Sequence, residues 1–293
     1  MLSDAECRRH NQLPPPTHAP LLPPSTTSQL DCRHYLRCSG CTLDNSLDSP
    51  PIYQEAAAFF QSLDVVLPPL RVGNVHGWRH RARLAVRAHS ARDPRPAIGL
   101  FAEGTHSVMP ISDCRVHHPS INAAVAAVAE CAEAAGVSGY NERTGLGQLR
   151  YLQATVVGNE PSSSKGSGSG GRARVQLALV WNSSATEEEE LAAKASAAAQ
   201  AAVSRAQRQA WRRPPRQPHA TPLRHLASEL WLRHGGNGLL HSIWANFQPL
   251  RSNTILGPEW LLLHGQERAW AALGGTEVCF TPASFMQASA ECA

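Results

Sequence analysis

Three cysteines crowd into ten positions near the start of the chain, and their types and spacing could bind a metal. Cys32, Cys38 and Cys41 are spaced C-x5-C-x2-C, in a chain that has 8 cysteines among 293 residues. A C-x2-C pair lets two thiolates converge on one centre across a tight turn, and Gly40 permits the backbone geometry of such a turn. Cysteines seldom cluster in this way without a metal or a disulfide. We therefore expect a fourth ligand elsewhere, and Cys114 is the best candidate.

The cysteines alone leave the kind of metal open. Four thiolates hold either a cubane iron–sulfur cluster or a structural zinc ion. Cys114 and His117 form a C-x2-H pair that could supply mixed ligands to zinc in a non-catalytic RNA-binding module. A third alternative is an iron–sulfur electron carrier, which would have only one cluster's worth of cysteines.

Disulfides are disfavoured because no secretory signal is visible. The first thirty residues carry Asp4, Glu6 and a string of prolines, and they lack the apolar segment at the centre of a secretory signal peptide. We therefore expect an intracellular, reducing compartment, with cytoplasm and organelle both open. The longest apolar run, residues 121–137, is interrupted by Glu130 and Glu133, so we expect no membrane partner. We expect a monomer.

Composition indicates a folded chain with long loops. Hydrophobic residues make up 42% of the sequence and can supply a core, whereas charged residues make up only 17%. The length suits one or two domains. The formal net charge of +4 is mild. It allows an anionic partner without requiring one.

Residues 78–89 alternate with a period of two, which predicts a strand. Its even positions are mostly apolar, whereas Arg79, Arg81, Arg83 and Arg87 occupy odd positions. This pattern predicts one buried face and one face lined by arginines. A local positive stripe is typical of phosphate contacts, so we expect Arg79, Arg81 and Arg83 to bind RNA. The alternative is a charged edge strand that only prevents aggregation.

The remaining patterns predict an α+β fold, with a mainly antiparallel sheet and flanking helices. Apolar spacing and terminal signals predict helices over residues 51–63, 119–135, 186–211 and 222–234. Cys131, within the second of these helices, is expected to be a small core residue. Strands are predicted over residues 97–108, 148–157, 174–181, 239–247, 260–263, 269–273 and 277–280.

Several motifs together resemble RNA uracil-5-methyltransferases, in the iron–sulfur branch that modifies ribosomal RNA. They are the cysteine cluster, the Trp-Arg-His-Arg-Ala-Arg-Leu run at 78–84, Ile-Gly-Leu at 98–100, Asp-Cys at 113–114, His-Pro at 118–119, and Gly-Gln-Leu-Arg-Tyr-Leu at 147–152. Further matches are His-Ser-Ile-Trp-Ala-Asn at 241–246, residues 253–257, and Phe-Thr-Pro-x-x-Phe-Met-Gln at 280–287. They follow the family's order over about residues 32–290.

The resemblance implies a ligand set, a cofactor and a reaction. It implies that Cys32, Cys38, Cys41 and Cys114 ligate a [4Fe–4S] cluster. It also implies that Gln287 contacts S-adenosylmethionine and that Phe285 lies near the flipped uracil. In this family a cysteine attacks the uracil ring, the neighbouring carbon takes the methyl group from the sulfonium, and a carboxylate then removes the proton. The base must first leave the RNA stack.

Composition and the resemblance together set expectations for domain organisation. Residues 1–30 are expected to be a disordered proline-rich leader. Residues 31–50 are expected to form the cysteine segment, and residues 51–282 a central RNA-contacting domain with low-complexity insertions at 158–173 and 183–222. Residues 283–293 resemble the start of a methyltransferase domain whose cofactor loop, catalytic cysteine and base do not follow in this sequence. No N-terminal oligonucleotide-binding barrel is evident. We therefore expect a fragment that is inactive alone.

Overall fold

The computed structural model describes residues 28–90, 92–158, 173–207, 221–236, 238–273 and 276–287. The chain divides into two compact units, one made of residues 1–31 and 43–75 and the other of residues 32–42 and 76–293. The predicted leader lies outside the described residues up to position 27, as do residues 159–172 and 208–220 of the predicted insertions. Among the helices that are described, none combines the length and the apolar character needed to span a membrane.

Among its described residues, the first unit contains one helix, α2 (Pro51–Gln61). It begins at a proline, whose missing N–H and fixed φ suit the first helical position. The predicted helix is confirmed and ends two residues early. None of its residues is buried, and Phe59 and Phe60 stay partly exposed. A hydrogen bond from the hydroxyl of Tyr53 to the carbonyl of Pro68, at 2.7 Å, ties the helix to the following segment.

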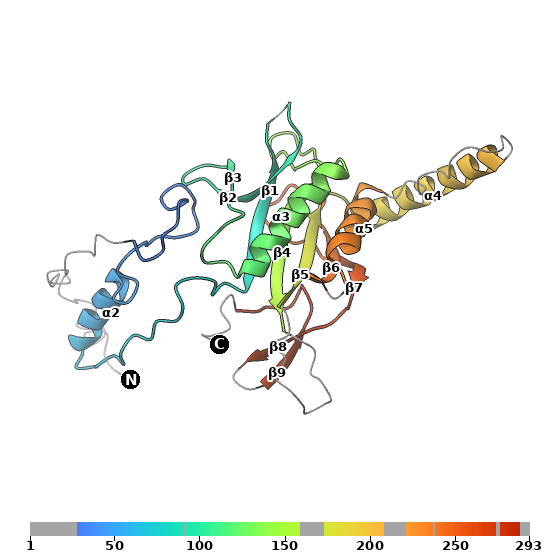
Figure 1. Ribbon diagram of the computed structural model, residues 1–293. Coiled ribbons are helices and arrows are strands. Elements are labelled where there is room, and N and C mark those ends of the chain that lie inside the picture. The colour runs from blue at the N-terminus through green and yellow to red at the C-terminus, as the bar shows by residue number, and fades with distance from the viewer. Residues whose placement is uncertain are drawn as a thin grey trace, which may run out of the picture. The chain divides into compact units, whose positions relative to one another are not determined.

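The second unit is built on a seven-stranded sheet with the order β3-β2-β1-β4-β5-β6-β7 (Figure 1). All neighbouring strands are antiparallel except β5 and β6, which are parallel. Parallel strands need a long crossover, and here it contains the helices α4 (Ala185–Gln207) and α5 (Pro222–His234). The expected α+β fold is confirmed. The strands are β1 (Arg81–Ala88), β2 (Pro96–Phe101), β3 (Val108–Pro110), β4 (Leu149–Val157), β5 (Arg174–Trp181), β6 (Leu240–Phe247) and β7 (Glu259–Gly265).

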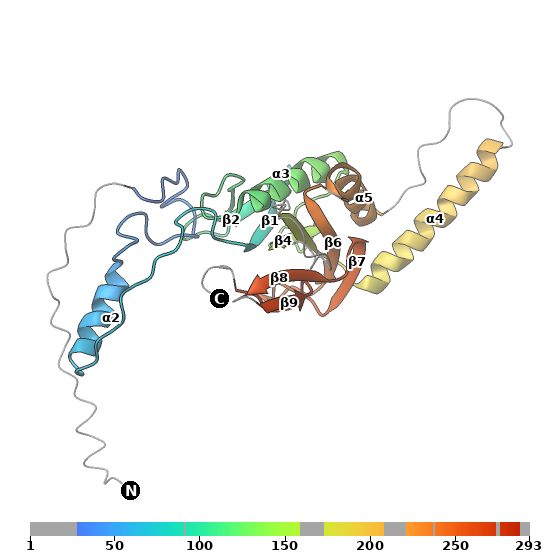
Figure 2. The same ribbon diagram turned by 60° about the horizontal axis from the view of Figure 1, so that its bottom comes forward.

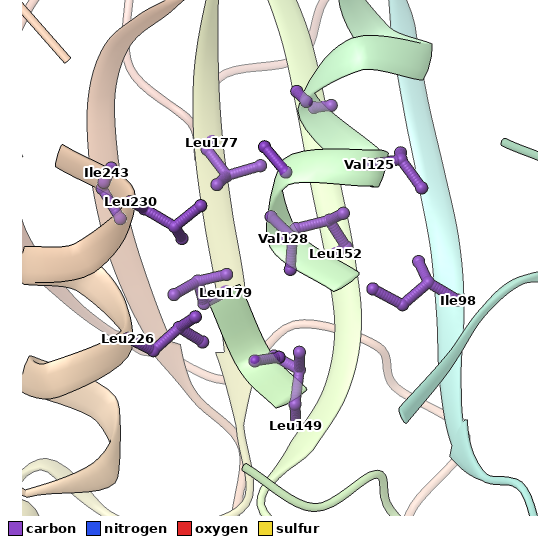
Figure 3. Close-up of a cluster of buried hydrophobic side chains, with 14 of the residues drawn as sticks. Ile98, Val125, Val128, Leu149, Leu152, Leu177, Leu179, Leu226, Leu230 and Ile243 are labelled. Atoms are coloured by element: carbon purple, nitrogen blue, oxygen red, sulfur yellow. The ribbon is translucent and has the colours of Figure 1, made fainter. Parts of the chain in front are cut away.

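One face of this sheet is covered by α3 (Pro119–Ala134) and α5. The two helices pack against each other as well as against the strands. Figure 3 shows Val128 of α3 and Leu230 of α5 turned toward Leu152 and Leu177 of the sheet. Cys131 of α3 is fully buried in this cluster, as the sequence predicted. Burial of these apolar side chains is the main force that holds the unit together.

A small hairpin stands on the other side of the sheet (Figure 2). Its strands, β8 (Ala269–Leu273) and β9 (Thr276–Phe280), pair only with each other. Ala269 and Phe280 pack against Val157 at the end of β4 in a second, smaller apolar cluster. The hairpin therefore brings the end of the described chain back to the central strands.

The predicted arginine-lined face of β1 is wrong for two of its members. Arg81 and Arg87 are only 8% and 7% exposed, whereas Arg83 is exposed. The guanidinium of Arg87 donates hydrogen bonds to Glu142 and lies against the ring of Tyr140. Arg87 is held by the loop at 139–148, and Arg81 by the carbonyls of Pro282 and Ser284, contacts that a period of two within β1 does not reveal.

Candidate metal centre and RNA-facing surface

The loop that carries Cys32, Cys38 and Cys41 is fastened to the end of β2. The backbone N–H of Ser39 donates to the carbonyl of Phe101 at 3.1 Å. Cys38 itself forms an isolated antiparallel bridge with the next residue of that strand end. The strand therefore fixes the middle cysteine of the motif directly, and the other two follow from the tight turns on either side.

Gly40 allows a backbone N–H to approach a sulfur. Its N–H lies 3.3 Å from Sγ of Cys38, as a hydrogen bond from nitrogen to sulfur. A Cβ at position 40 would lie 3.2 Å from that sulfur and 2.8 Å from Cδ1 of Leu100. Any larger residue would therefore displace either the sulfur or a side chain of the strand beneath it.

Cys114 lies in a turn that follows β3. Its backbone N–H donates to the carbonyl of Ile111 at 3.1 Å, and its own carbonyl accepts from the amide of Asn122 at 3.0 Å. Burial raises the pKa of the Cys114 thiol, and hydrogen bonds from the backbone N–H groups of Val116 and His117 oppose that rise. The turn therefore presents the sulfur with two donors, which stabilise a thiolate. The ring Nδ1 of His117 is engaged with Asn122 at 3.1 Å.

The structure brings the four predicted ligands into one neighbourhood. Burial raises the pKa of the Cys41 thiol, and the nearby thiols of Cys114, Cys38 and Cys32 raise it further. The thiols of Cys32 and Cys38 likewise raise the pKa of the Cys114 thiol. All four side chains are partly buried, and none forms a disulfide. A thiol some seventy positions away in the sequence is therefore close to the three clustered ones.

The donor set fits an iron–sulfur cluster. Such clusters are held by four cysteine thiolates, and hydrogen bonds to sulfur of the kind seen here tune them. Four thiolates are also the ligand set of a structural zinc ion. Across the described ranges, no group of three or more His, Cys, Asp or Glu side chains is arranged to hold a metal ion. The cluster itself stays a prediction.

A polar bridge joins the two cysteine segments, and the sequence did not reveal it. Oδ1 of Asp113 lies 2.7 Å from Nε2 of His34, and Oδ2 lies 2.7 Å from the guanidinium of Arg33. Asp113 precedes Cys114, and the two partners follow Cys32. The hydrogen bond from His34 and the charge of Arg33 hold the pKa of Asp113 below its usual value. In the sequence, the only sign of this bridge was an acidic residue next to Cys114 and two basic residues next to Cys32.

The three predicted RNA-contacting arginines have different environments. The guanidinium of Arg79 lies 4.7 Å from the ring of Trp78 and is half-exposed. Arg83 is exposed, and its Nε donates to Oε1 of Gln153 at 2.8 Å. Arg81 is buried and donates to two backbone carbonyls. Arg79 and Arg83 are therefore accessible to an anion, and a phosphate role for Arg81 stays a prediction.

The two residues expected near the cofactor and the flipped base follow β9. Phe285 is 87% exposed, and Gln287 is also exposed. Between them, Met286 packs against the small apolar cluster around Phe280. An aromatic ring is thus presented to solvent on a segment that is otherwise anchored. A ring in this setting can stack on a base, because every base has a π-face.

A separate pocket of about 370 Å³ opens beside the loop at 139–148. Sequence patterns gave no sign of it, because its walls come from separate segments: the end of β1 and the turn after it, β2, residues 106–108 and this loop. Within it, Glu142 pairs with both Arg87 and His106. The polar residues lining it are Arg87, His89, Ser90, His106, Ser107, Tyr140, Asn141, Glu142 and Arg143.

The chain is similar to proteins named RNA methyltransferases. An uncharacterized RNA methyltransferase of Protochlamydia amoebophila is 33% identical over 269 residues, which are 92% of this chain and 58% of that protein. One of Geobacter sulfurreducens is 36% identical over 137 residues, 44% of this chain and 27% of the relative. The 23S rRNA (uracil(1939)-C(5))-methyltransferase RlmD of Methylococcus capsulatus is 33% identical over 110 residues, 35% of this chain and 24% of the relative.

Two further comparisons complete this picture. No protein-family model matches the sequence. The crystal structure of the Pyrococcus abyssi tRNA (uracil-54, C5)-methyltransferase in complex with S-adenosyl-L-homocysteine aligns with a TM-score of 0.42 and 17% identity, over 74% of this chain and 38% of that one. The chain spans 58% or less of the length of each of these proteins. Over nine-tenths of its length, the chain is similar to a protein named as an RNA methyltransferase.

Proposed function

We propose that this chain is part of an RNA uracil-5-methyltransferase that uses S-adenosylmethionine and acts on ribosomal or transfer RNA. The similarity to the Protochlamydia protein, 33% identity over 269 residues, carries this proposal. Because the chain spans 58% of that relative, we propose that methyl transfer requires residues beyond these 293. The described residues would then supply RNA contacts and the cysteine site.

The described side chains suit the steps that precede methyl transfer. S-adenosylmethionine supplies the methyl group when it is bound, and Gln287 is the residue here that would contact it. Phe285 presents an exposed ring on which a flipped uracil could stack. Arg79 and Arg83 are accessible and would contact phosphates.

Cys32, Cys38, Cys41 and Cys114 would hold a [4Fe–4S] cluster with a structural role. Methyl transfer from a sulfonium moves no net electron, so the reaction does not need a redox centre. The cluster would instead tie the loop at 32–41 to the turn at 114, across the edge of the sheet at β2 and β3. In the alternative, a non-catalytic RNA-binding module, Cys114 and His117 would supply mixed ligands to a structural zinc ion, so metal content separates the two.

RNA binding by the 293-residue chain tests the proposal. We expect a uracil-containing single-stranded RNA to bind with an affinity that falls as salt rises. Arg79→Ala and Arg83→Ala should each weaken binding and lower the salt slope by about one phosphate contact. Arg233→Ala is the matched control, because Arg233 pairs with Glu130 and Glu229 on the helix face. Salt slopes that are unaltered in the first two variants would remove these arginines from the interface.

A chimera tests the chemistry. This chain would replace the matching segment of the Protochlamydia relative, and the nucleosides of ribosomal RNA would be measured by mass spectrometry. We expect 5-methyluridine from the chimera and its loss with Phe285→Ala. A chimera that makes none, while the intact relative does, would contradict the proposed function.

A further inference from the structure

The segment that follows β9 is held in place by its backbone. After Phe280, the N–H of Ser284 donates to the carbonyl of Thr281 at 3.1 Å, and the N–H of Thr281 donates back to Oγ of Ser284 at 3.1 Å. This closed turn leaves the carbonyls of Pro282 and Ser284 free to accept other bonds. Both carbonyls point to the same side chain.

That side chain is Arg81 of β1, about 200 residues earlier. Its Nη1 donates to the carbonyl of Ser284 at 2.6 Å, and its Nη2 donates to the carbonyl of Pro282 at 2.7 Å. Arg81 is 8% exposed, so water competes little for these bonds. Burial and the nearby charge of Arg83 lower the pKa of Arg81 to about 10. The guanidinium therefore stays protonated at neutral pH and keeps all its donors.

A second side chain, that of Gln153 in β4, contacts the same turn. Nε2 of Gln153 donates to the carbonyl of Pro282 at 2.9 Å, and its Oε1 accepts from Nε of Arg83 at 2.8 Å. Gln153 is 1% exposed. Two central strands thus hold one turn through three donated hydrogen bonds. The planar fork of an arginine suits two separate carbonyls better than the single ammonium of a lysine does.

The turn that Arg81 and Gln153 hold lies immediately before the exposed ring of Phe285. Phe285 is 87% exposed, so its own side chain contributes little packing that could fix its position. The fixed points are the carbonyl of Ser284 on one side and the packed Met286 on the other. The direction of the ring therefore depends on how the backbone is held on either side of it, by Arg81 before the ring and by Met286 after it, and not on contacts of the ring itself.

We propose that Arg81, assisted by Gln153, is a positioning residue that holds the turn at 281–284 so that Phe285 and Gln287 face the RNA base and the cofactor. This inference rests on the proposed function. It assigns Arg81 a different role from the phosphate contact that the arginine pattern suggested. The two roles predict opposite results.

The test uses the 293-residue chain with Arg81→Met, and with Arg233→Met as a matched control far from the turn. Amide hydrogen exchange of residues 281–287 should become about tenfold faster in Arg81→Met alone, because two hydrogen bonds to this segment are lost. RNA binding should weaken about as much as in Phe285→Ala, and the double variant should bind no more weakly than Phe285→Ala. The salt slope should not change.

The opposite outcomes overturn the proposal. A salt slope lowered by about one, with unchanged exchange, would assign Arg81 to a phosphate. Additive losses in the double variant would separate Arg81 from Phe285. If Arg81→Met does not fold, Gln153→Glu removes one donor to Pro282 at constant volume and should also speed exchange at 281–287. If the wild-type chain binds no RNA, the proposed function fails, and the exchange data still decide whether Arg81 holds the turn.

Discussion

Oδ1 of Asp113 lies 2.7 Å from Nε2 of His34, so the residue beside Cys114 is bonded to a residue two positions after Cys32. His34 is 9% exposed and the Asp113 side chain 46% exposed, so water reaches this bond only from the side of Asp113. The two halves of the cysteine site are therefore joined by protein atoms as well as by any metal. A ligand set that is held together in this way loses less conformational entropy when it binds a metal.

The bridge between Asp113 and His34 should slow the release of metal from the cysteine site. Asp113→Ala should lower the iron retained by the reconstituted chain and speed its removal by a chelator about tenfold or more, as is typical when residues that orient metal ligands are changed. Asp93→Ala is the matched control, because Asp93 also pairs with an arginine, Arg95, but on another loop. Equal rates of chelation in Asp113→Ala and the wild type would show that the bridge does not support the site.

Loss of a cysteine ligand should destabilise the reconstituted chain. Cys38→Ser removes the thiol that Gly40 bonds, and because metal binding contributes to folding free energy, we expect a lower melting temperature and loss of iron. Cys279→Ser is the control, since Cys279 is an exposed free cysteine on β9. Thermal unfolding and iron analysis check this. An unchanged melting temperature in Cys38→Ser would contradict a structural role for the cluster.

A buried carboxyl group makes the stability depend on pH. Glu188 of α4 is 2% exposed and accepts a hydrogen bond from Oγ1 of Thr221. Burial raises the pKa of Glu188 above its ordinary value, although that bond and Arg224 oppose the rise. The folded state therefore holds this proton more tightly than the unfolded state does, so stability falls as pH rises through the raised pKa.

Glu188→Gln should remove this effect, because glutamine keeps an acceptor for Thr221 without the charge. Its melting temperature should exceed that of the wild type at pH 8, and the difference should shrink toward pH 5. Glu189→Gln, at an exposed neighbour, is the control. A difference that stays constant or grows on acidification would show that Glu188 is not responsible.

Gln176 of β5 is 1% exposed, and neither polar atom of its amide has a hydrogen-bond partner among the described residues. Gln176→Met should therefore stabilise the fold by about 1 kcal/mol, because it removes buried polar atoms at similar volume.

On the neighbouring strand, the buried amide of Asn246 bonds both the N–H and the carbonyl of Gly257 at 2.8 Å. Asn246→Leu should cost about 1–3 kcal/mol. Denaturant unfolding measures both, and a destabilised Gln176→Met would contradict the first expectation.

Much of the fold could be predicted because its signals are local. The bounds of β5 and α5 match the predicted ranges, since β5 is a short apolar run and α5 begins at a proline and ends before two glycines. The burial of Arg81 could not be predicted in this way. Alternation within β1 shows that two faces exist, but not that the carbonyls of Pro282 and Ser284 hold Arg81.

The cysteine site, too, could be predicted from the sequence only in part. Spacing within residues 32–41 pointed to a metal, and a leftover thiol at position 114 suggested the fourth ligand. Its partners were hidden, because the bridge from Asp113 to His34 spans 79 residues and leaves no periodic trace. The donors to Cys114 are backbone N–H groups, which every residue other than proline carries.

Iron and acid-labile sulfide, measured per chain after anaerobic reconstitution, test the central claim most directly. We predict about four of each, with broad absorption in the violet, and their loss in Cys114→Ser but not in Cys279→Ser. A colourless protein that holds one zinc ion, or full iron and sulfide retained in Cys114→Ser, would contradict the account.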